Sequence, residues 1–526
     1  MKKLIAAFLL LASSLSAMAQ GKPMNPITRA MMQVYDQQLA ENPKDYEVYF
    51  RRANEYYNHD QYLRALSDIE NAVKYTPSND KDMLFKEYSL RGNIYSMTGR
   101  HEEALADFQK ALSFDPNSYV TIYELANEQF VTGNMADAKA NYKKLQRLNP
   151  RSTEALVGLT RVAVKEGNKS LAQDLMNQIV DLNPSSSASY IRRANVRKEI
   201  GDNTGAVEDL VVAISMEGNS RAVQELVLMG DVDYTATING LSSAIRTAPN
   251  VALFYYLRAT IAMAHFRYQA ALTDYHTIIN ENLYNYPGLY DAMAKCYLAL
   301  GQYPEALKEC NFAIGMADNN GPYYITLAKI HRAMGDYELA LEAADKAVEK
   351  TPGDVDAMVE KALCLVSVNK PKESAEILGE VILTDDAQPY NLMLRAWVLN
   401  DCLKQPQAAT ALYNRVAEMD FTDGEVRSLR GFAQLFAGDT KAAERWIEGV
   451  LKKTDNDGLL HYYGACFYAY AGNTDKAFEC MEKSLQAGYA NAYDWNVNTD
   501  ARINVAPIRG EQRFKLLMSK YDYLFL

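Results

Sequence analysis

Residues 85–118 read FKEYSLRGNIYSMTGRHEEALADFQKALSFDPNS and contain one complete structural unit. Two stripes lie in it at helical spacing, the first at Tyr88, Arg91, Gly92 and Tyr95 and the second at Ala104, Phe108 and Ala111. Gly99 separates them, at a point where a helix must end in a left-handed conformation that glycine adopts at low cost. Pro116 stops the second helix. The stretch therefore predicts two helices joined by a tight turn.

This unit returns along the chain every 34 residues. Glycine recurs at that interval at Gly99, Gly133, Gly167 and Gly201, and proline does so at Pro116, Pro150 and Pro184. Two further pairs, Gly301 with Gly335 and Gly438 with Gly472, repeat the interval. A fixed period of this length indicates one supersecondary unit stacked many times. We expect an all-α solenoid whose function lies in a surface, because each unit contacts only its neighbours.

The recurring residues resemble the tetratricopeptide repeat family over almost the whole mature chain. The resemblance implies a right-handed superhelical solenoid of about 13 helix-turn-helix units with a C-terminal capping segment. Residues 20–217 are assigned to an N-terminal arm (a half-unit and five repeats), and residues 252–491 to a C-terminal arm of seven repeats. Residues 218–251 form a degenerate repeat between the arms, and residues 492–526 form the cap.

Two places depart from the period. Residues Asp80 to Leu84 are a small insertion, which we expect to form a longer loop. In residues 218–251 the first helix is expected to be a turn short and to lack an aromatic residue, and several glycines loosen it. A bend between the arms and plain sequence drift both explain this stretch.

Many first helices carry a basic residue followed by a small one where the family usually has Leu-Gly. These pairs are Arg52-Ala53, Arg193-Ala194, Arg258-Ala259, Lys361-Ala362, Arg395-Ala396 and Arg430-Gly431. The small residue lets two helices pack closely. We expect the basic side chain to lay its stem along the helix and extend its charge to solvent.

The N-terminus has the pattern of a secretory signal peptide. Lys2 and Lys3 precede an apolar run from Leu4 to Leu15, and Ala17-Met18-Ala19 gives a small-residue cleavage site before Gln20. Residues 1–19 are therefore assigned to the signal peptide. No cysteine lies near the site, so the chain is not expected to be a lipoprotein. We expect a periplasmic or secreted bacterial protein without a membrane-inserted segment.

The charge of the mature chain argues against two classes of partner. Removing Lys2 and Lys3 lowers the basic count from 55 to 53 against 66 acidic residues, which leaves a net charge of −13. Nucleic-acid binding depends on cations that displace counterions, so we expect none. Anionic membrane surfaces are disfavoured for the same reason.

Cysteines and histidines give no sign of a metal, cofactor or catalytic site. Cys296 with Cys310 and Cys466 with Cys480 repeat a 14-residue spacing, but their places face the core, and buried thiols are expected rather than disulfides. The six histidines fall singly, without metal-ligand spacing. No phosphate-binding or nucleophile motif occurs, so we expect no cofactor and no enzyme.

A row of amides on the first helices suggests a binding face. The ninth place of the repeat carries Asn54, Asn93, Asn127 and Asn195, with Arg161 in the remaining unit. In this family the first helices line the concave face, where side chains commonly hold an extended peptide. An amide both donates and accepts, which suits a peptide backbone. Apolar neighbours on this face are Phe50, Tyr57, Tyr123, Phe130 and Ile191. The alternative is that the asparagines make only local hydrogen bonds.

The inner face of the C-terminal arm is expected to be aromatic instead. Its residues are Tyr256, Trp397, Phe432, Phe436, Tyr462 and Tyr470. Aromatic anchors are enriched in binding hot spots. A tightly wound solenoid that buries them between adjacent helices is the competing explanation, and we favour it slightly.

The end of the chain is expected to close the array. Trp495, Ile508, Phe514 and Leu517 are the apolar residues available to cover the open side of the last repeat.

These features favour a non-enzymatic scaffold that binds an extended peptide or a partner protein in its concave groove, in the bacterial envelope. The alternative is a chaperone-like or assembly factor for exported or outer-membrane proteins, which would capture many clients rather than one or two. An enzyme is disfavoured because repeats account for residues 28–491 and the remaining tail of about 35 residues cannot house a catalytic domain. The sequence leaves partner identity and homo-oligomerisation open.

Overall fold

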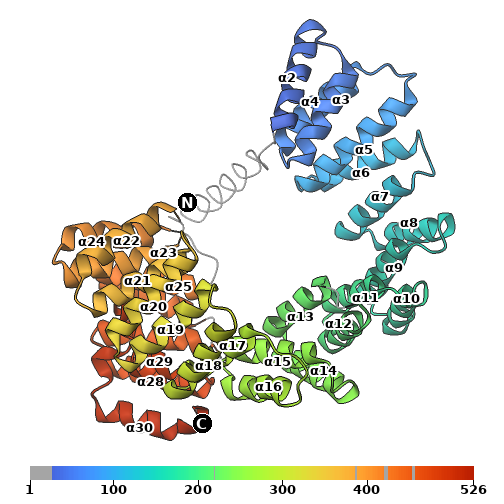
Figure 1. The fold of residues 1–526 in the computed structure, drawn as a ribbon. Helices are drawn as coiled ribbons and strands as arrows, with labels where there is room; N and C mark the ends of the chain where they lie inside the picture. The colour runs from blue at the N-terminus through green and yellow to red at the C-terminus, as the bar shows by residue number, and fades with distance from the viewer. Residues whose placement is uncertain (1–25, 218–219, 385–387, 420–423, 453–456, 526) are drawn as a thin grey trace. The chain divides into compact units, whose positions relative to one another are not determined.

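The structure, a computed structural model, describes residues 26–217, 220–384, 388–419, 424–452 and 457–525. Within them it contains consecutive pairs of α-helices, short 3-10 and π segments, and no strand (Figure 1). This confirms the predicted all-α array of helix-turn-helix units. The chain divides into two compact parts, called here unit 1 (up to Met229) and unit 2 (from Gly230). The predicted signal peptide lies outside the described residues.

Unit 1 begins with a single helix and continues in pairs. Its helices are α2 (Pro26–Glu41), α3 (Tyr46–Asn58), α4 (Tyr62–Tyr75), α5 (Lys81–Met97), α6 (His101–Leu112), α7 (Tyr119–Val131), α8 (Met135–Leu148), α9 (Thr153–Lys165), α10 (Lys169–Asp181), α11 (Ser187–Glu199) and α12 (Asn203–Glu217). The boundary between the units falls within α13 (Ser220–Val232).

Unit 2 continues the pairs and ends in an irregular segment. Its helices are α14 (Tyr234–Thr247), α15 (Ala252–Ala264), α16 (Tyr268–Asn280), α17 (Pro287–Ala299), α18 (Tyr303–Met316), α19 (Gly321–Met334), α20 (Tyr337–Lys350), α21 (Val355–Ser367), α22 (Pro371–Thr384), α23 (Pro389–Trp397) with η1 (Val398–Cys402), α24 (Pro406–Glu418), α25 (Gly424–Phe436), α26 (Thr440–Leu451), α27 (Gly458–Tyr470) and α28 (Thr474–Gln486). Then follow α29 (Ala492–Asn496), η2 (Asp500–Arg502), η3 (Ala506–Ile508), α30 (Gln512–Lys520) and η4 (Asp522–Leu524).

The turn glycines behave as predicted. Gly99 has φ of 73° and Gly335 has φ of 86°, and the other glycines at this place are also left-handed. Non-glycine residues take the same conformation in other repeats, among them Phe266 (φ 60°) and Lys404 (φ 55°). A side chain makes the left-handed region costly. Phe266 packs its ring on Tyr489 at a centroid distance of 4.7 Å, and the ammonium of Lys404 donates to the carbonyl oxygen of Asp401 at 2.7 Å.

Close packing within a repeat explains the small residue on each first helix. A Cβ at Gly92 would lie 2.7 Å from a ring carbon of Phe108 on the second helix. Ala53 and Ala259, at the same place in other repeats, are fully buried. Only a hydrogen or a methyl group therefore fits between the two helices.

In four repeats the basic residue before that small residue does not extend to solvent, so the expectation was wrong for Arg52, Arg193 and Arg258. Arg91 on α5 forms two hydrogen bonds, of 2.6 and 2.8 Å, with the carboxylate of Asp107 on α6. The same paired contact, 16 residues apart, joins Arg52 to Asp68, Arg193 to Asp209 and Arg258 to Asp274. Leaving the buried carboxylate without a charged partner would cost more free energy than withdrawing the guanidinium group from water, so the arginine turns toward the aspartate.

Several of these arginines also reach back to the preceding repeat. The second guanidinium nitrogen of Arg258 donates to Ser242 Oγ at 2.8 Å, and that of Arg193 donates to Asn177 at 3.2 Å. Arg52 contacts Asp36 on α2 in the same way, at 2.5 Å. One planar side chain thus joins three helices, which links each repeat to the one before it.

The predicted loop at Asp80 to Leu84 is also a correction. Residues 81–84 form the first turn of α5, which is therefore 17 residues long. The Asp80 side chain accepts a hydrogen bond from the N–H of Met83 and caps the helix. A capping aspartate followed by good helix formers extends the helix rather than the loop.

The first helix of the 218–251 stretch is not short, contrary to expectation. α13 spans 13 residues. The missing residues belong to the turn, since Asp233 alone separates α13 from α14 and caps α14 by accepting from the N–H of Ala236. The degenerate unit has therefore lost its turn and kept its helices.

One repeat absorbs an extra residue inside a helix. The unit at 389–423 is one residue longer than the 34-residue period. Its first helix continues from α23 into the π turn η1, which carries Asp401. A π turn accommodates one additional residue without ending the helix.

All six cysteines are free thiols in the described structure. Cys296, Cys310, Cys466 and Cys480 are buried, as expected, and Cys364 is buried too. Burial raises the pKa of Cys296 and Cys310 to about 12, which keeps both thiols protonated.

Candidate functional site

The inner face of unit 1 presents amides from successive first helices that contact one another. Asn54 on α3 is exposed, and Asn93 on α5 and Asn195 on α11 are half-buried. Their side chains make no hydrogen bond to other described residues. The structure thus leaves three of the four predicted amides available at the ninth place of the repeat.

Asn127 on α7 is different from the other three asparagines. Its Oδ1 accepts a 2.7 Å hydrogen bond from the hydroxyl of buried Tyr142, and its side chain also bonds Glu124. Burial raises the pKa of Glu124, although the bond to Asn127 opposes this. Asn127 therefore makes the local hydrogen bonds that the sequence left open as an alternative.

The predicted apolar neighbours are half exposed. Phe50 and Tyr57 contact the core around Ile69, and Tyr123 and Phe130 contact the core around Tyr142. Part of each ring remains accessible on the first helices. Ile191, in contrast, is buried.

At Arg161 the amide row is replaced by an ion pair. Its guanidinium binds the carboxylate of Glu199 on α11 through two bonds of 2.7 and 2.6 Å. The pair joins two first helices across the face. In the repeat that lies between those of Asn127 and Asn195, the ninth place therefore carries a charged pair instead of an amide.

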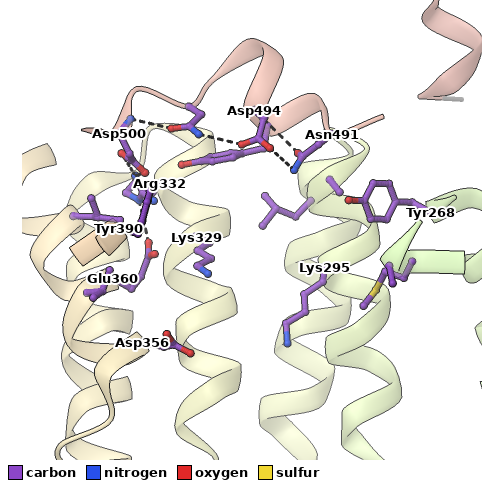
Figure 2. Close-up of a pocket in the computed structure, with 18 of the residues that line it drawn as sticks. Tyr268, Lys295, Lys329, Arg332, Asp356, Glu360, Tyr390, Asn491, Asp494 and Asp500 are labelled. Atoms are coloured by element: carbon purple, nitrogen blue, oxygen red, sulfur yellow. Dashed lines mark hydrogen bonds and ion pairs between the residues drawn. The ribbon is translucent and has the colours of Figure 1, made fainter. Parts of the chain in front are cut away.

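The inner face of unit 2 is covered by the chain itself. Residues 489–509, called here the tail segment, contact the first helices α17, α23 and α27. Figure 2 shows this segment passing over the helices that carry Lys295, Lys329 and Glu360. Sequence reasoning placed this region only at the open end of the array. α30 does pack on α28, the last repeat helix, with Phe514 and Leu517 buried.

A buried ion network holds the tail segment to α19 and α21. Arg332 binds both oxygens of Asp500 at 2.9 and 3.0 Å, and its Nε donates to Glu360 at 3.0 Å. All three residues are at least nine-tenths buried. Burial opposes the charge of Arg332, but the two carboxylates hold its pKa above the ordinary value.

Three further polar contacts hold the tail segment. Arg502 donates to Asp401 on the π turn at 2.6 Å, and the hydroxyl of Tyr470 donates to Asn504 at 3.0 Å. Arg509 donates to the backbone carbonyl groups of Trp495 and Asp494 at 2.7 and 3.1 Å. The last contact fixes the shape of the segment itself rather than its docking.

Trp495 supplies the main apolar contact of the tail segment. Its side chain is fully buried, and its ring meets that of Tyr462 edge to face at a centroid distance of 4.9 Å. Its indole N–H donates to the carbonyl oxygen of Tyr489 at 3.2 Å. Full burial of a tryptophan with its N–H satisfied is the largest single contribution such a segment can make.

This packing corrects part of the predicted aromatic face. Phe432 and Tyr462 are 0% and 2% exposed, so both are core residues and neither is an exposed anchor of a groove. Phe436 lies under the guanidinium of Arg502. Tyr256 contacts the rings of Tyr275 and Tyr286, and Trp397 packs against the core of unit 2. The adjacent chain, rather than a partner, surrounds most of these rings.

A cavity of about 670 Å³ remains beneath the tail segment, and sequence reasoning missed it. Lys295 and Lys329 line it from the ninth place of the repeat, where unit 1 has asparagines, and Arg332 lies one turn further on. Reading the ninth place through both arms would have found the two lysines. The tail residues opposite them lie far away in the sequence and carry no repeat signal.

Other chemistry finds little support in the described part of the chain. No group of three or more histidine, cysteine or acidic residues there is arranged to hold a metal ion. Among the described helices, none combines the length and apolar character that a membrane crossing requires.

Stacked helix pairs with an inner face lined by first helices define an α-helical repeat protein, a solenoid whose stacked units form an extended surface. Sequence profiles of the tetratricopeptide repeat match residues 85–118, 123–210, 325–391 and 424–448. These matches identify tetratricopeptide repeats in both units of the chain.

Named relatives are distant. U-box domain-containing protein 70 of Oryza sativa subsp. japonica is 28% identical over 127 residues, which is 23% of this chain and 16% of that protein. The chain thus matches about a sixth of that relative's length. Yeast Tom70 is 16% identical, with a TM-score of 0.37 over 77% of this chain and 97% of that one. A tetratricopeptide repeat protein from Parabacteroides merdae is 18% identical, with a TM-score of 0.29 over 54% and 98%. Likenesses of this size do not transfer a function.

Proposed function

We propose that the protein is a non-enzymatic scaffold whose unit 1 binds an extended peptide segment of a partner protein on its inner face. The observation that carries the proposal is the set of accessible amides at Asn54, Asn93 and Asn195. No described residue of the chain occupies their hydrogen-bonding groups. Each amide offers one acceptor and two donors, which match the C=O and N–H groups of an extended backbone.

Apolar contacts accompany these amides. The half-exposed rings of Phe50, Tyr57, Tyr123 and Phe130 lie on the same first helices. Rigid aromatic side chains lose little conformational entropy on binding and are enriched in binding hot spots. We therefore infer a ligand with apolar side chains spaced between backbone contacts.

We also propose that the scaffold acts in the envelope of a bacterium. The basic start, the apolar run and the Ala17-Met18-Ala19 site support export and cleavage before Gln20. N-terminal sequencing of the protein from the periplasm or culture medium tests this. A mature chain that begins at Gln20 is expected, and an uncleaved cytoplasmic chain would contradict the proposal.

Site-specific crosslinking tests the binding face. A photoreactive residue replaces Asn93 on the inner face, and in a matched variant it replaces Gln109, which is exposed on the second helix α6. Envelope extracts are irradiated with each variant and the crosslinked peptides are sequenced. One or two partner segments joined at position 93 and absent at 109 are expected.

The captured segment is then made as a synthetic peptide and titrated calorimetrically. Combined substitution of Asn54, Asn93 and Asn195 by alanine is expected to weaken binding at least about tenfold, since each lost amide removes hydrogen bonds to the peptide. Gln109→Ala with Gln178→Ala, on exposed second-helix positions, is expected to leave it unchanged. Equal crosslinking at both positions, or equal affinity of all variants, would overturn the proposal. Crosslinks to many unrelated unfolded chains would indicate a chaperone-like role instead.

A further inference from the structure

The cavity beneath the tail segment has the size of a small-molecule site. Its volume is about 670 Å³, and its walls come from α15, α16, α17, α19, α21 and α23 with the tail segment opposite (Figure 2). Small-ligand sites usually measure about 300–1,000 Å³. Asn491, Tyr493 and Asp494 of the tail segment form one side of it.

A second cavity adjoins the first. It has a volume of about 430 Å³ and shares Tyr390, Asp494 and Asn498 with the larger one. Its other lining residues include three more tyrosines, Tyr462, Tyr463 and Tyr489. The side chains that separate the cavities are therefore aromatic and polar but not basic.

The charges that line the larger cavity nearly cancel. Lys295 pairs with Asp291 at 2.6 Å, and Arg332 is held between Glu360 and Asp500. Lys329 and Asp356, also in the lining, have opposite charges, and both are exposed. Asp494 is a further acid of the lining, and neutral donors hold it. Charges of both signs therefore line the site, so a ligand with a strong charge of one sign would meet like charges as well as opposite ones.

The neutral polar groups, in contrast, have no partners. The hydroxyl groups of Tyr268, Tyr390 and Tyr493 and the side-chain amide of Asn391 line the cavity and make no hydrogen bond to other described residues. In Figure 2 the hydroxyl of Tyr268 points into the space below the tail segment. Burial raises the pKa of Tyr390 and Tyr493, so both phenols stay neutral donors. Asn391 is buried, Tyr268 and Tyr493 are half-buried, and Tyr390 is 38% exposed. Polar groups that face a cavity without a partner in the protein are available to a ligand or to water.

A neighbouring acid is already arranged by the tail segment. Asp494 accepts hydrogen bonds from Asn491 at 2.7 Å and from Asn498 at 3.0 Å, and also from the hydroxyl of Tyr489. These bonds hold the acid and the two amides together in the cavity wall. Fixed polar groups beside aromatic rings suit a ligand that has hydroxyl groups on its edge and C–H groups on its faces.

We propose that this cavity binds a small neutral saccharide, a hexose or a disaccharide of hexoses. Its hydroxyl groups bond the phenols of Tyr268, Tyr390 and Tyr493 and the amide of Asn391, and a ring face lies against one of the tyrosines. Because the tail segment forms one wall, saccharide binding stabilises the docked tail. This site is separate from the peptide face proposed for unit 1, and either proposal can fail without the other.

The test is calorimetric titration of the full mature chain. The probes are glucose, galactose, mannose, N-acetylglucosamine, cellobiose, maltose and lactose, with citrate, arginine and choline as charged probes of similar size. At least one saccharide is expected to bind with one-to-one stoichiometry and a millimolar or lower Kd, and the charged probes are not expected to bind. Hydrogen exchange in residues 489–509 is expected to slow when the saccharide is present.

Variants locate the site. Tyr390→Phe removes one hydroxyl and keeps the ring, and Asn391→Ala removes the amide, so each is expected to weaken binding about tenfold. The matched controls Tyr337→Phe and Asn311→Ala, exposed in unit 2 outside the cavity, are expected to bind as the parent does. Unchanged tail protection in the ligand-free Tyr390→Phe chain shows that its fold is intact.

Three results would overturn the proposal. No saccharide of the panel binds; a saccharide binds equally well to Tyr390→Phe and Asn391→Ala; or a charged probe competes for the site while the saccharides do not.

Discussion

Unit 1 and unit 2 are built from the same repeat, but different atoms cover their inner faces. In unit 1 the ninth place of the repeat carries accessible amides at Asn54, Asn93 and Asn195. In unit 2 the same place carries Lys295, Lys329 and the buried Phe432, and the tail segment lies over the first helices. The repeats therefore determine where the inner face forms. A few side chains on that face determine whether it stays accessible, as in unit 1, or packs against the tail segment, as in unit 2.

The largest expected effect comes from a substitution that detaches the tail segment and so exposes the inner face of unit 2. Trp495→Ala removes the fully buried ring that contacts Tyr462 and Tyr489, and it is expected to cost unit 2 about 3–5 kcal/mol. Hydrogen exchange followed by peptide is the measurement, because a repeat array does not unfold as one cooperative unit. Protection is expected to fall around residues 489–509 and in α27, and to stay unchanged in α3 to α8. Equal losses in both units would contradict the division between them.

A second test uses the buried acid Glu87 of unit 1, whose titration is expected to change the stability of that unit. Glu87 on α5 is fully buried, and the hydroxyl of Thr76 donates to its Oε1 at 2.6 Å. Burial raises its pKa to about 7, although the bond from Thr76 opposes this. The folded state thus holds this proton more tightly than the unfolded chain, whose pKa is near 4.5. Its contribution to stability is complete below pH 4.5 and is lost as the pH rises through about 7.

Glu87→Gln removes this titration while keeping the size of the side chain. The variant is expected to stabilise unit 1 by about 2–3 kcal/mol above pH 8 and to flatten its pH dependence between pH 5 and 8. Hydrogen exchange at matched pH values in α4 to α6 measures the effect. Glu102→Gln, an exposed acid on α6, serves as the control. A pH dependence that persists in Glu87→Gln would assign the titration to another group.

The smallest expected effect compares two asparagines at the same place of the repeat. Asn93→Ala is expected to change the stability of unit 1 by less than about 0.5 kcal/mol, because its amide bonds no other described residue. Asn127→Ala leaves the hydroxyl of buried Tyr142 without its acceptor, and it is expected to cost about 1–2 kcal/mol. Hydrogen exchange in α5 to α8 of both variants is the measurement. If the two costs are equal, Asn93 has a structural role and the amide row loses one of its members.

Sequence reasoning predicted the paired helices and their turns well because the period is enforced by local rules. Gly99 and its counterparts must be left-handed, and Gly92 must leave room for Phe108, so the residues that impose the fold are visible one at a time. Two errors concerned helix ends that Asp80 and Asp233 cap locally. The others came where a side chain finds a partner 16 or more residues away. Arg91 pairs with Asp107 and Arg332 with Asp500, and neither pairing follows from helical periodicity.

The candidate site was predictable only to the extent that it follows the repeat. The amides of unit 1 share one register, so the sequence located them, and only the contact of Asn127 with Tyr142 needed the structure. The cavity of unit 2 combines six helices with a non-repeating tail segment. Its Asn491, Tyr493 and Asp494 meet helices that lie more than a hundred residues earlier in the sequence, a relation that no local pattern encodes.

The π turn at Val398–Cys402 limits how the protein can change by duplication. Helical residues advance about 100° each, so removing the extra residue would swing Asp401 away from Arg502 by more than a quarter turn. Loss or gain of one whole repeat in unit 1 would shorten or lengthen the array without disturbing its neighbours. The same event between α19 and α28 would displace Arg332, Asp401 and Tyr470 relative to the tail segment that joins them. Unit 2 can therefore vary by substitution, whereas unit 1 is also free to vary in length.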